Sequence, residues 1–156
     1  MARPNDIGPL ASPGFWLHRA ALAWLADLDA RLRPLGLTHT QFTLLASTSW
    51  LTWEQEPVTQ QEIASFAGCD RMMASRVLRS LEDRRLLERR SDAGNGRIVL
   101  VEVTVAGHDL VLAAVKAAAG TDAAFFPEAG TRARLREELR ALVEDHHPPG
   151  GHSPTD

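Results

Sequence analysis

The sequence contains one cysteine, Cys69, and no tyrosine. A single thiol excludes an internal disulfide framework and cannot by itself build a cysteine-rich zinc site. No apolar run approaches the roughly 20 residues that a membrane-spanning helix needs. Residues 1–13 also lack the charged and apolar segments of a signal peptide. These absences predict a cytoplasmic protein without a membrane partner.

Signatures of catalysis and of cofactor binding are missing as well. The sequence has no Gly-x-Ser-x-Gly nucleophile elbow, no glycine-rich phosphate loop and no zinc-ligand spacing. The six histidines do not fall at the helical spacings of a built metal site, although the three in the C-terminal tail could bind metal incidentally. We therefore expect no enzymatic activity, no cofactor and no metal site.

Positive charge is concentrated in one segment of the chain. The whole protein carries a formal net charge of −3, but residues 71–97 hold eight arginines against four acids, a local charge of +4. A basic block on an acidic body is typical of a surface that meets phosphate. A solvated, arginine-rich surface without any partner would have the same composition.

Hydrophobic periodicity and capping signals predict a mainly helical chain with one β-hairpin. Capping boxes begin at Thr38 and Thr59, Gly68 provides a left-handed exit, and Asp70 is a suitable N-cap. The Asn95-Gly96 pair is a strong hairpin signal. Helices are expected over 14–33, 38–50, 59–67, 71–84, from 104 to an interruption at 120–130, and over 131–145, with strands over 86–90 and 98–103.

The first predicted helix carries a long apolar stripe that we expect to be buried in the core. Its members recur at helical spacing and are Leu17, Ala21, Trp24, Leu25, Leu28 and Leu32. The order of elements, with two short helices followed by a hairpin, predicts a winged helix-turn-helix between residues 58 and 103.

Segment 71–84 divides into two faces. Its core face has apolar residues at i, i+3, i+4 and i+7, namely Ala74, Val77, Leu78 and Leu81. The opposite face has the residues expected to read a major groove, namely Arg71, Met72, Ser75, Arg76 and Arg79. At the hairpin tip, Asn95 and Arg97 are predicted to contact a neighbouring minor groove. An ordinary exposed helix and surface turn are the alternatives.

Three stretches of the chain resemble the MarR family of bacterial transcriptional regulators. They are Val58-Thr-Gln-Gln-Glu-Ile-Ala, Asp70-Arg-Met-Met-Ala-Ser-Arg-Val-Leu-Arg-Ser-Leu-Glu and Leu86-Leu-Glu-Arg-Arg, within a resemblance over about residues 14–145. The resemblance implies a homodimer whose N-terminal helix and last two helices intertwine. It also implies binding to pseudo-palindromic double-stranded DNA, repression, and release by a small, often aromatic ligand.

With this resemblance, the expected fold is mainly α with a small β-wing: a winged helix-turn-helix plus helical dimerisation arms. The expected divisions are a flexible N-terminus (1–13), supporting and dimerising helices (14–57), the DNA-binding region (58–103), C-terminal dimerisation helices (104–145) and a disordered tail (146–156). Two positions depart from the family pattern. Asn95 replaces an aspartate, and Arg85 stands where glycine is frequent.

Residues that could sense a signal are less well marked. Cys69 is interpreted as a small buried hydrophobe, with redox sensing beside Arg71 as the alternative. Trp16, His39 and Trp50 are candidate walls of an aromatic effector pocket, although Trp more often serves as core. A winged helix used for protein docking without DNA remains the competing function. It would need exposed apolar anchors.

Overall fold

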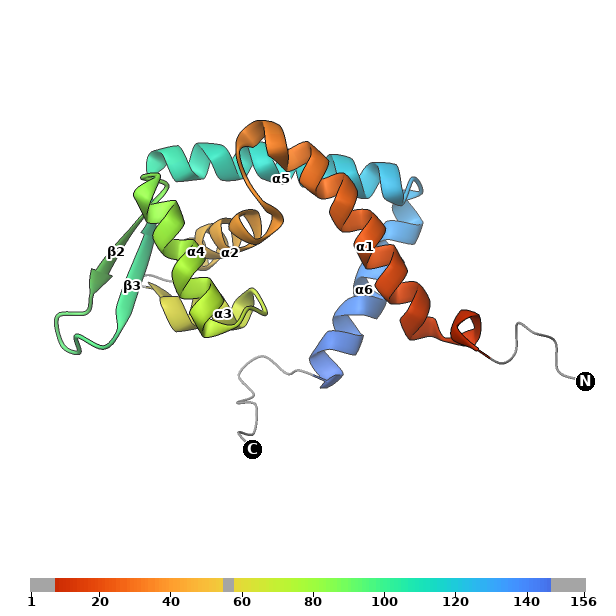
Figure 1. Ribbon diagram of the computed structural model, residues 1–156, viewed down its shortest axis with the longest axis horizontal. Coiled ribbons are helices and arrows are strands. Elements are labelled where there is room, and N and C mark those ends of the chain that lie inside the picture. The colour runs from red at the N-terminus through yellow and green to blue at the C-terminus, as the bar shows by residue number, and fades with distance from the viewer. Residues whose placement is uncertain (1–7, 55–57, 147–156) are drawn as a thin grey trace, which may run out of the picture.

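The computed structural model describes residues 8–54 and 58–146 (Figure 1). The elements are α1 (Pro13–Leu32), α2 (His39–Glu54), β1 (Val58–Thr59), α3 (Gln60–Phe66), α4 (Arg71–Asp83), β2 (Leu87–Ser91), β3 (Val99–Val103), α5 (Val105–Phe125) and α6 (Ala129–His146). Two short 3-10 turns, Pro9–Ala11 and Arg33–Leu35, flank α1. The predicted fold class is confirmed. The expected C-terminal tail lies outside the described residues except for His146.

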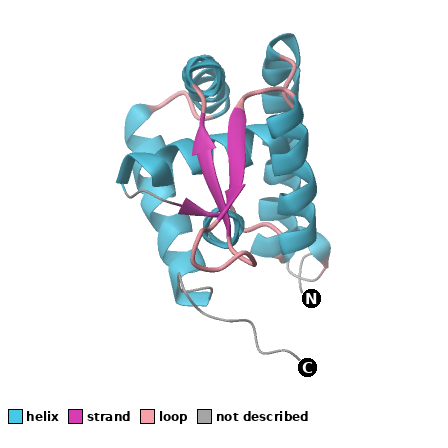
Figure 2. Ribbon diagram, turned by 90° about the vertical axis from the view of Figure 1, so that its left-hand side faces the viewer, coloured by secondary structure: helices cyan, strands magenta, loops and turns pink. Residues whose placement is uncertain are grey.

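The three strands form one antiparallel sheet in the order β1-β3-β2 (Figure 2). The pairing of β2 with β3 runs from Leu87 opposite Val103 to Ser91 opposite Val99. The two-residue strand β1 is absent from the sequence-based prediction because Val58 and Thr59 are too few to show a period-two pattern. The β2–β3 hairpin is the wing, and together with α3 and α4 it forms what we call the reading lobe.

Local capping signals fix the starts of the helices as predicted. At α2, the Thr38 amide donates to Gln41 Oε1 at 3.0 Å, and the Gln41 amide donates to Thr38 Oγ1 at 3.2 Å. At α3, Thr59 and Glu62 form the same reciprocal pair, at 2.7 and 3.2 Å. Each pair satisfies amides that would otherwise lack a partner in the first helical turn.

The α5 helix is longer than predicted. It continues through Gly120 to Phe125, and only residues 126–128 separate it from α6. An interior glycine costs a helix about 1 kcal/mol, and here the alanines on both sides are strong helix formers. A Cβ at Gly120 would lie 3.2 Å from Arg31 Nη1, so the missing side chain leaves room for α1 to pack closely.

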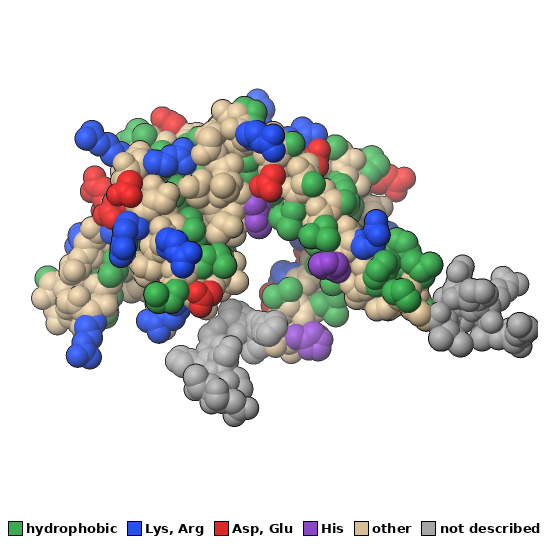
Figure 3. Space-filling model, in the orientation of Figure 1, with side chains coloured by type: hydrophobic (Ala, Val, Ile, Leu, Met, Phe, Trp, Pro, Cys, Tyr) green, Lys and Arg blue, Asp and Glu red, His purple; other side chains and the backbone are tan. Residues whose placement is uncertain are grey.

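The arms, α1 and α6, leave apolar side chains uncovered. Of the predicted stripe on α1, Leu28 and Leu32 are buried, Trp24 and Leu25 are half-buried, and Leu17 and Ala21 are exposed. No residue of α6 is buried. Figure 3 shows hydrophobic side chains gathered over the end of α1 nearest the N-terminus. The stripe is therefore only partly buried within the described chain, because the first half of α1 extends beyond the rest of it (Figure 1).

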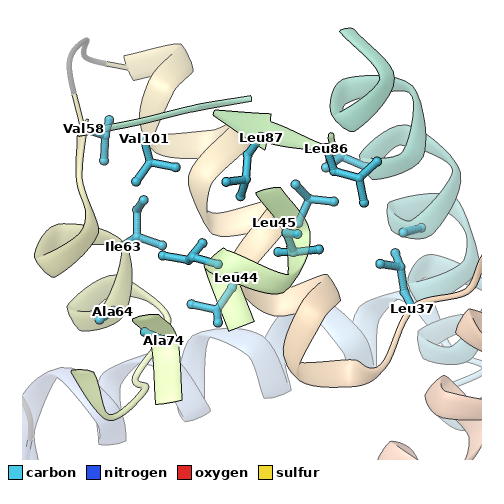
Figure 4. Packing of buried hydrophobic residues seen from close by; sticks show 14 of the residues in the cluster. Leu37, Leu44, Leu45, Val58, Ile63, Ala64, Ala74, Leu86, Leu87 and Val101 are labelled. Carbon is cyan, nitrogen blue, oxygen red and sulfur yellow. The ribbon is translucent and has the colours of Figure 1, made fainter. Parts of the chain in front are cut away.

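The hydrophobic core lies beneath the reading lobe, around α2 (Figure 4). Leu44 and Leu45 of α2 are fully buried, as are Ile63 of α3 and Leu78 of α4. The inner face of the sheet completes this core with Val58, Leu87 and Val101. The core therefore holds α3, α4 and the base of the wing on one support.

In the described part of the chain, no single helix is both long and apolar enough to cross a membrane. Val105–Phe125 and Ala129–His146 meet that test only as a pair bent by 106°, on length and composition alone.

Candidate nucleic-acid interface

Helix α4 presents the two faces that its sequence predicts. Ala74, Leu78 and Leu81 are fully buried, and Val77 is half-buried. On the other face, the residues predicted to read DNA are exposed, except for Ser75, which is half-buried. The exposed ones are Arg71, Met72, Arg76 and Arg79. Figure 3 shows Lys and Arg side chains distributed over this lobe. An amphipathic helix on a packed core can therefore offer a rigid row of donors to a duplex.

The entry to α4 is fixed by two residues. Gly68 has φ of +64°, a left-handed conformation that lets the chain leave α3 sharply. Asp70 then accepts from the amides of Met72 and Met73 at 2.9 and 3.0 Å. This cap sets the direction of the first turn of α4, where Arg71 and Met72 lie.

The wing ends in a structured loop. Ser91 and Val99 are the last strand pair, so seven residues, 92–98, form the connection. Asp92 Oδ1 accepts from the amides of Gly94 and Asn95, both at 2.8 Å, and Asn95 Oδ1 accepts from the Arg97 amide at 3.2 Å. Asn95 thus keeps a hydrogen-bonding role that positions the backbone of the exposed Arg97.

The hairpin is confirmed, but its turn is not the tight type that Asn-Gly favours. A two-residue type I′ turn requires positive φ at both central residues. Among the described residues, neither Asn95 nor Gly96 has a positive φ. The Asp92 carboxylate organises a longer loop instead, because it bonds two successive amides.

The turn between α4 and β2 places Arg85 in an unusual conformation. Its φ is +58°, the left-handed region that glycine occupies readily. Its carbonyl oxygen accepts from Thr104 Oγ1 at 2.8 Å, and the Thr104 hydroxyl also caps α5 by accepting from the Gly107 amide at 3.0 Å. The departure at Arg85 therefore changes the residue and leaves the glycine-type turn in place.

Three of the eight arginines in the basic block bind within the protein. Arg84 donates to the Gly36 carbonyl oxygen at 3.0 Å, Arg90 pairs with Glu102 at 2.8 Å, and Arg89 pairs with Glu82 at 3.5 Å. Within residues 8–54 and 58–146, Arg71, Arg76, Arg79 and Arg97 form no ion pair. Fewer of these arginines are therefore available to an outside partner than the count of eight in residues 71–97 suggests.

Cys69 packs partly against the core between α3 and α4. Its Sγ lies 3.7 Å from the Ala67 carbonyl oxygen, and burial raises the pKa of the thiol. Desolvation disfavours the thiolate, which opposes the effect expected from the helix start and from Arg71. The environment suits a structural residue.

The three candidate effector residues lie apart in the protomer. Trp16, half-exposed, donates its indole N–H to the Leu10 carbonyl oxygen at 2.9 Å. His39 lies edge-on to Trp24, with ring centroids 6.3 Å apart, at the start of α2. Trp50 is exposed and lies three turns further along α2, about 16 Å in helical rise. The described chain therefore does not by itself bring Trp16, His39 and Trp50 into one pocket.

The structure adds residues at the α1–α5 contact that the sequence patterns miss. Trp24 Nε1 donates to Asp122 Oδ1 at 2.8 Å across 98 positions of the chain. Asp27 and Arg31 pair nearby at 2.9 Å, and this bond holds the pKa of Asp27 below its usual value. No group of three metal-ligating side chains occurs in the ranges that the structure describes.

Comparison with known proteins identifies the family. The sequence profile described as the MarR family matches residues 37–99. The helix-turn-helix (HTH) type transcriptional regulator YdcH of Bacillus subtilis is 36% identical over 137 residues, covering 88% of this chain and 93% of YdcH. The chain belongs to the MarR family. An HTH-type transcriptional repressor of Mycobacterium tuberculosis is also similar to this MarR chain, at 30% identity over 140 residues covering 89% and 94% of the two chains.

Solved structures of another regulator, CouR, have the same fold. CouR from Rhodococcus jostii bound to p-coumaroyl-CoA superposes with a TM-score of 0.76 at 23% identity, covering 93% of this chain and 99% of CouR. CouR bound to a 23-mer DNA duplex gives the same TM-score at 24% identity, with 91% and 99% coverage. These likenesses show that the chain shares the CouR fold. The curated relatives are transcriptional regulators, which agrees at family level with the expectation of no enzyme.

Proposed function

We propose that this MarR chain is a transcriptional repressor that binds a pseudo-palindromic DNA duplex as a homodimer and is released by a small aromatic ligand. The observation that carries the proposal is the exposed face of α4. There, three arginines that form no ion pair within the described residues stand on a helix anchored by three fully buried residues. The proposal agrees with the M. tuberculosis relative, which is a repressor, and with CouR, a repressor whose structure has been solved bound to a 23-mer DNA duplex.

Each proposed contact follows from side-chain chemistry. Arg71, Arg76 and Arg79 have the planar fork that binds a guanine edge or a phosphate with two hydrogen bonds. Ser75 can reach a base or a phosphate, and Met72 can contact a thymine methyl group. Arg97, oriented through Asn95, would enter the adjacent minor groove, where negative potential is strong.

Dimerisation through α1, α5 and α6 is proposed because these helices leave apolar surface uncovered. On α1, Trp16, Leu17 and Leu22 are each about half exposed, and on α6 Leu139, Leu142 and Val143 are exposed. A monomer seldom exposes so many large apolar side chains on neighbouring elements. A second copy of the chain that covers them would also place two reading lobes in a symmetric pair.

A ligand would act by binding more tightly to a dimer whose reading lobes are wrongly spaced for DNA. CouR has been crystallised with p-coumaroyl-CoA, an aromatic acyl thioester, which makes aromatic acids and their thioesters the first class to screen. We propose His39 as the residue to substitute first, because its ring lies against Trp24 where α2 begins beside α1. Trp16 and Trp50 would join such a site only through the second subunit.

The proposal is tested by selecting bound sequences from random duplex DNA. A palindromic consensus is expected, and Arg76→Ala should lose about 1–3 kcal/mol of discrimination at one base pair of each half-site. Arg90→Ala is the matched control, since it removes the same charge from an exposed residue that already pairs with Glu102. Absence of any enrichment would refute DNA recognition and favour a protein-docking role.

A further inference from the structure

Arg89 is a charged residue on the buried face of the wing sheet. It pairs across the sheet with Val101, and Val101 pairs with Val58, and both valines are fully buried. Residues directly opposite one another in an antiparallel pair place their side chains on the same face. The Arg89 side chain, 12% exposed, therefore points from β2 towards α3 and α4.

Three parts of the reading lobe meet at the Arg89 guanidinium. Its Nη2 donates to Oε1 of Gln60, the first residue of α3, at 2.9 Å. Its Nη1 lies 3.5 Å from Oε2 of Glu82, in the last turn of α4. Within the described chain, the buried Nε has no hydrogen-bond partner.

This arrangement is a poor way to stabilise a fold. Burying a charge is costly, and an apolar side chain of similar volume is often as stable or more so. The unpaired Nε adds to that cost. The guanidinium does provide a planar, rigid fork with fixed angles between its bonds. Such a fork suits a residue that sets the relative position of three elements.

We propose that Arg89 is a positioning residue for DNA binding, which holds the wing at a fixed distance from α4. Arg97 at the wing tip and the arginines of α4 can then contact one duplex at the same time. The inference rests on the proposed function, since it concerns how the same surface engages DNA. Arg89 itself faces inward and touches no DNA in this assignment.

The test is a double-substitution cycle that measures affinity for the operator, the duplex obtained by selection from random DNA. Arg97→Ala should weaken binding about tenfold in the unmodified protein, the size expected for one lost charge-assisted contact. In an Arg89→Met background, Arg97→Ala should change binding less than about twofold, because the wing is no longer held in place. Arg89→Met alone should make the plot of log affinity against log salt concentration less steep. The decrease should be about the amount that one phosphate contact contributes.

Arg90→Met is the matched control. It removes the same charge from the adjacent residue, which pairs at the exposed surface with Glu102 at 2.8 Å. In that background Arg97→Ala should keep its full effect. Arg89→Lys keeps the charge and loses the fork. Relative to Arg89→Met, it should recover the long-range electrostatic contribution to DNA affinity, but the effect of Arg97→Ala should stay small.

Gln60→Ala reaches the same network from α3 and covers the case in which Arg89→Met does not fold. It should also reduce the effect of Arg97→Ala, with unfolding temperatures measured for every variant. An unchanged effect of Arg97→Ala in the Arg89→Met and Gln60→Ala proteins would overturn the positioning role while DNA binding stands. Failure of the unmodified protein to bind any duplex would overturn the proposed function instead.

Discussion

Arg85 shows how a single residue can depart from a backbone preference without altering the turn around it. A left-handed conformation costs a non-glycine residue about 1–2 kcal/mol. The turn persists because the Arg85 amide donates to the Glu82 carbonyl oxygen at 2.7 Å and its carbonyl accepts from Thr104. Neither bond uses the Arg85 side chain, so the conformation is imposed by the hydrogen bonds of the Arg85 backbone.

Replacing Arg85 with glycine should therefore stabilise the protein. We expect Arg85→Gly to raise the free energy of unfolding by up to about 1 kcal/mol, since relief of strain exceeds the added entropy of the unfolded chain. Urea denaturation measures the change. Arg76→Gly, at an exposed position inside the regular part of α4, should lower stability by about 1 kcal/mol. A loss of stability in both variants would show that Arg85 is not strained.

At Cys69, burial predicts low reactivity. Because desolvation raises the thiol pKa, the thiolate fraction at pH 8 is smaller in the folded protein than in the unfolded chain. Iodoacetamide should label the native protein more slowly than the urea-unfolded protein, and both rates should rise with pH. Peroxide treatment should leave operator affinity unchanged, as in Cys69→Ala. A loss of DNA binding that requires Cys69 would instead support redox sensing.

The first turn of α5 packs closely on the backbone that follows α4. A Cβ at Gly107 would lie 1.9 Å from the Leu86 carbonyl oxygen and 2.7 Å from Val103 Cγ1. The first turn of α5 thus packs directly on the chain that leaves α4. Together with the Thr104 bond to Arg85, this contact joins the reading lobe to the helix that runs towards the arms (Figure 1).

Two glycines of α5 should respond in opposite ways to alanine. Gly107→Ala should lower the free energy of unfolding by at least about 2 kcal/mol, because backbone atoms must move to admit the methyl group. Gly120→Ala meets only the far end of Arg31 at 3.2 Å, and alanine favours the helix, so stability should change little or rise. Equal effects in urea denaturation would contradict the close contact at Gly107.

The elements that sequence patterns predict well are those with local causes. Capping at Thr38 and Thr59, the exit at Gly68 and the two faces of α4 all depend on residues within about one helical turn. The extent of α5 was missed because its support beyond Gly120 includes a hydrogen bond from Trp24 of α1 to Asp122, far away in the chain. Arg89 was counted as surface charge, although its alternation with Leu87 along β2 placed it on the buried side.

At the scale of the whole molecule, the apolar pattern of the arms did not predict which of their residues are buried in the described chain. The stripe on α1 has helical spacing, yet its first half is exposed in the described chain. Periodicity marks the face that avoids water and does not say whether the cover comes from the same chain. For the same reason, the separation of Trp16, His39 and Trp50 could not be read from their types.

If the arms form the dimer, a charge on the apolar face of α6 should separate the subunits. We expect Leu142→Glu to convert the protein to monomer in sedimentation equilibrium and to lower operator affinity about 100-fold or more, because two linked half-site contacts become independent. Ala141→Glu places the same charge one residue earlier, away from the apolar stripe, and should remain dimeric. A dimeric Leu142→Glu protein would place the interface elsewhere.

A dimer with two rigidly held reading lobes should also measure the distance between half-sites. Recognition helices in adjacent major grooves on one side of a duplex lie about 34–36 Å apart, one helical turn. Inserting five base pairs at the centre of the operator rotates one half-site by about half a turn, so affinity should fall about 1,000-fold, to the non-specific level. Five central substitutions without a change in length should cost far less. If the Leu142→Glu monomer binds each half-site alone, its weak affinity should not depend on the insertion. If the unmodified protein binds the operator equally well with the insertion, the two lobes bind independently.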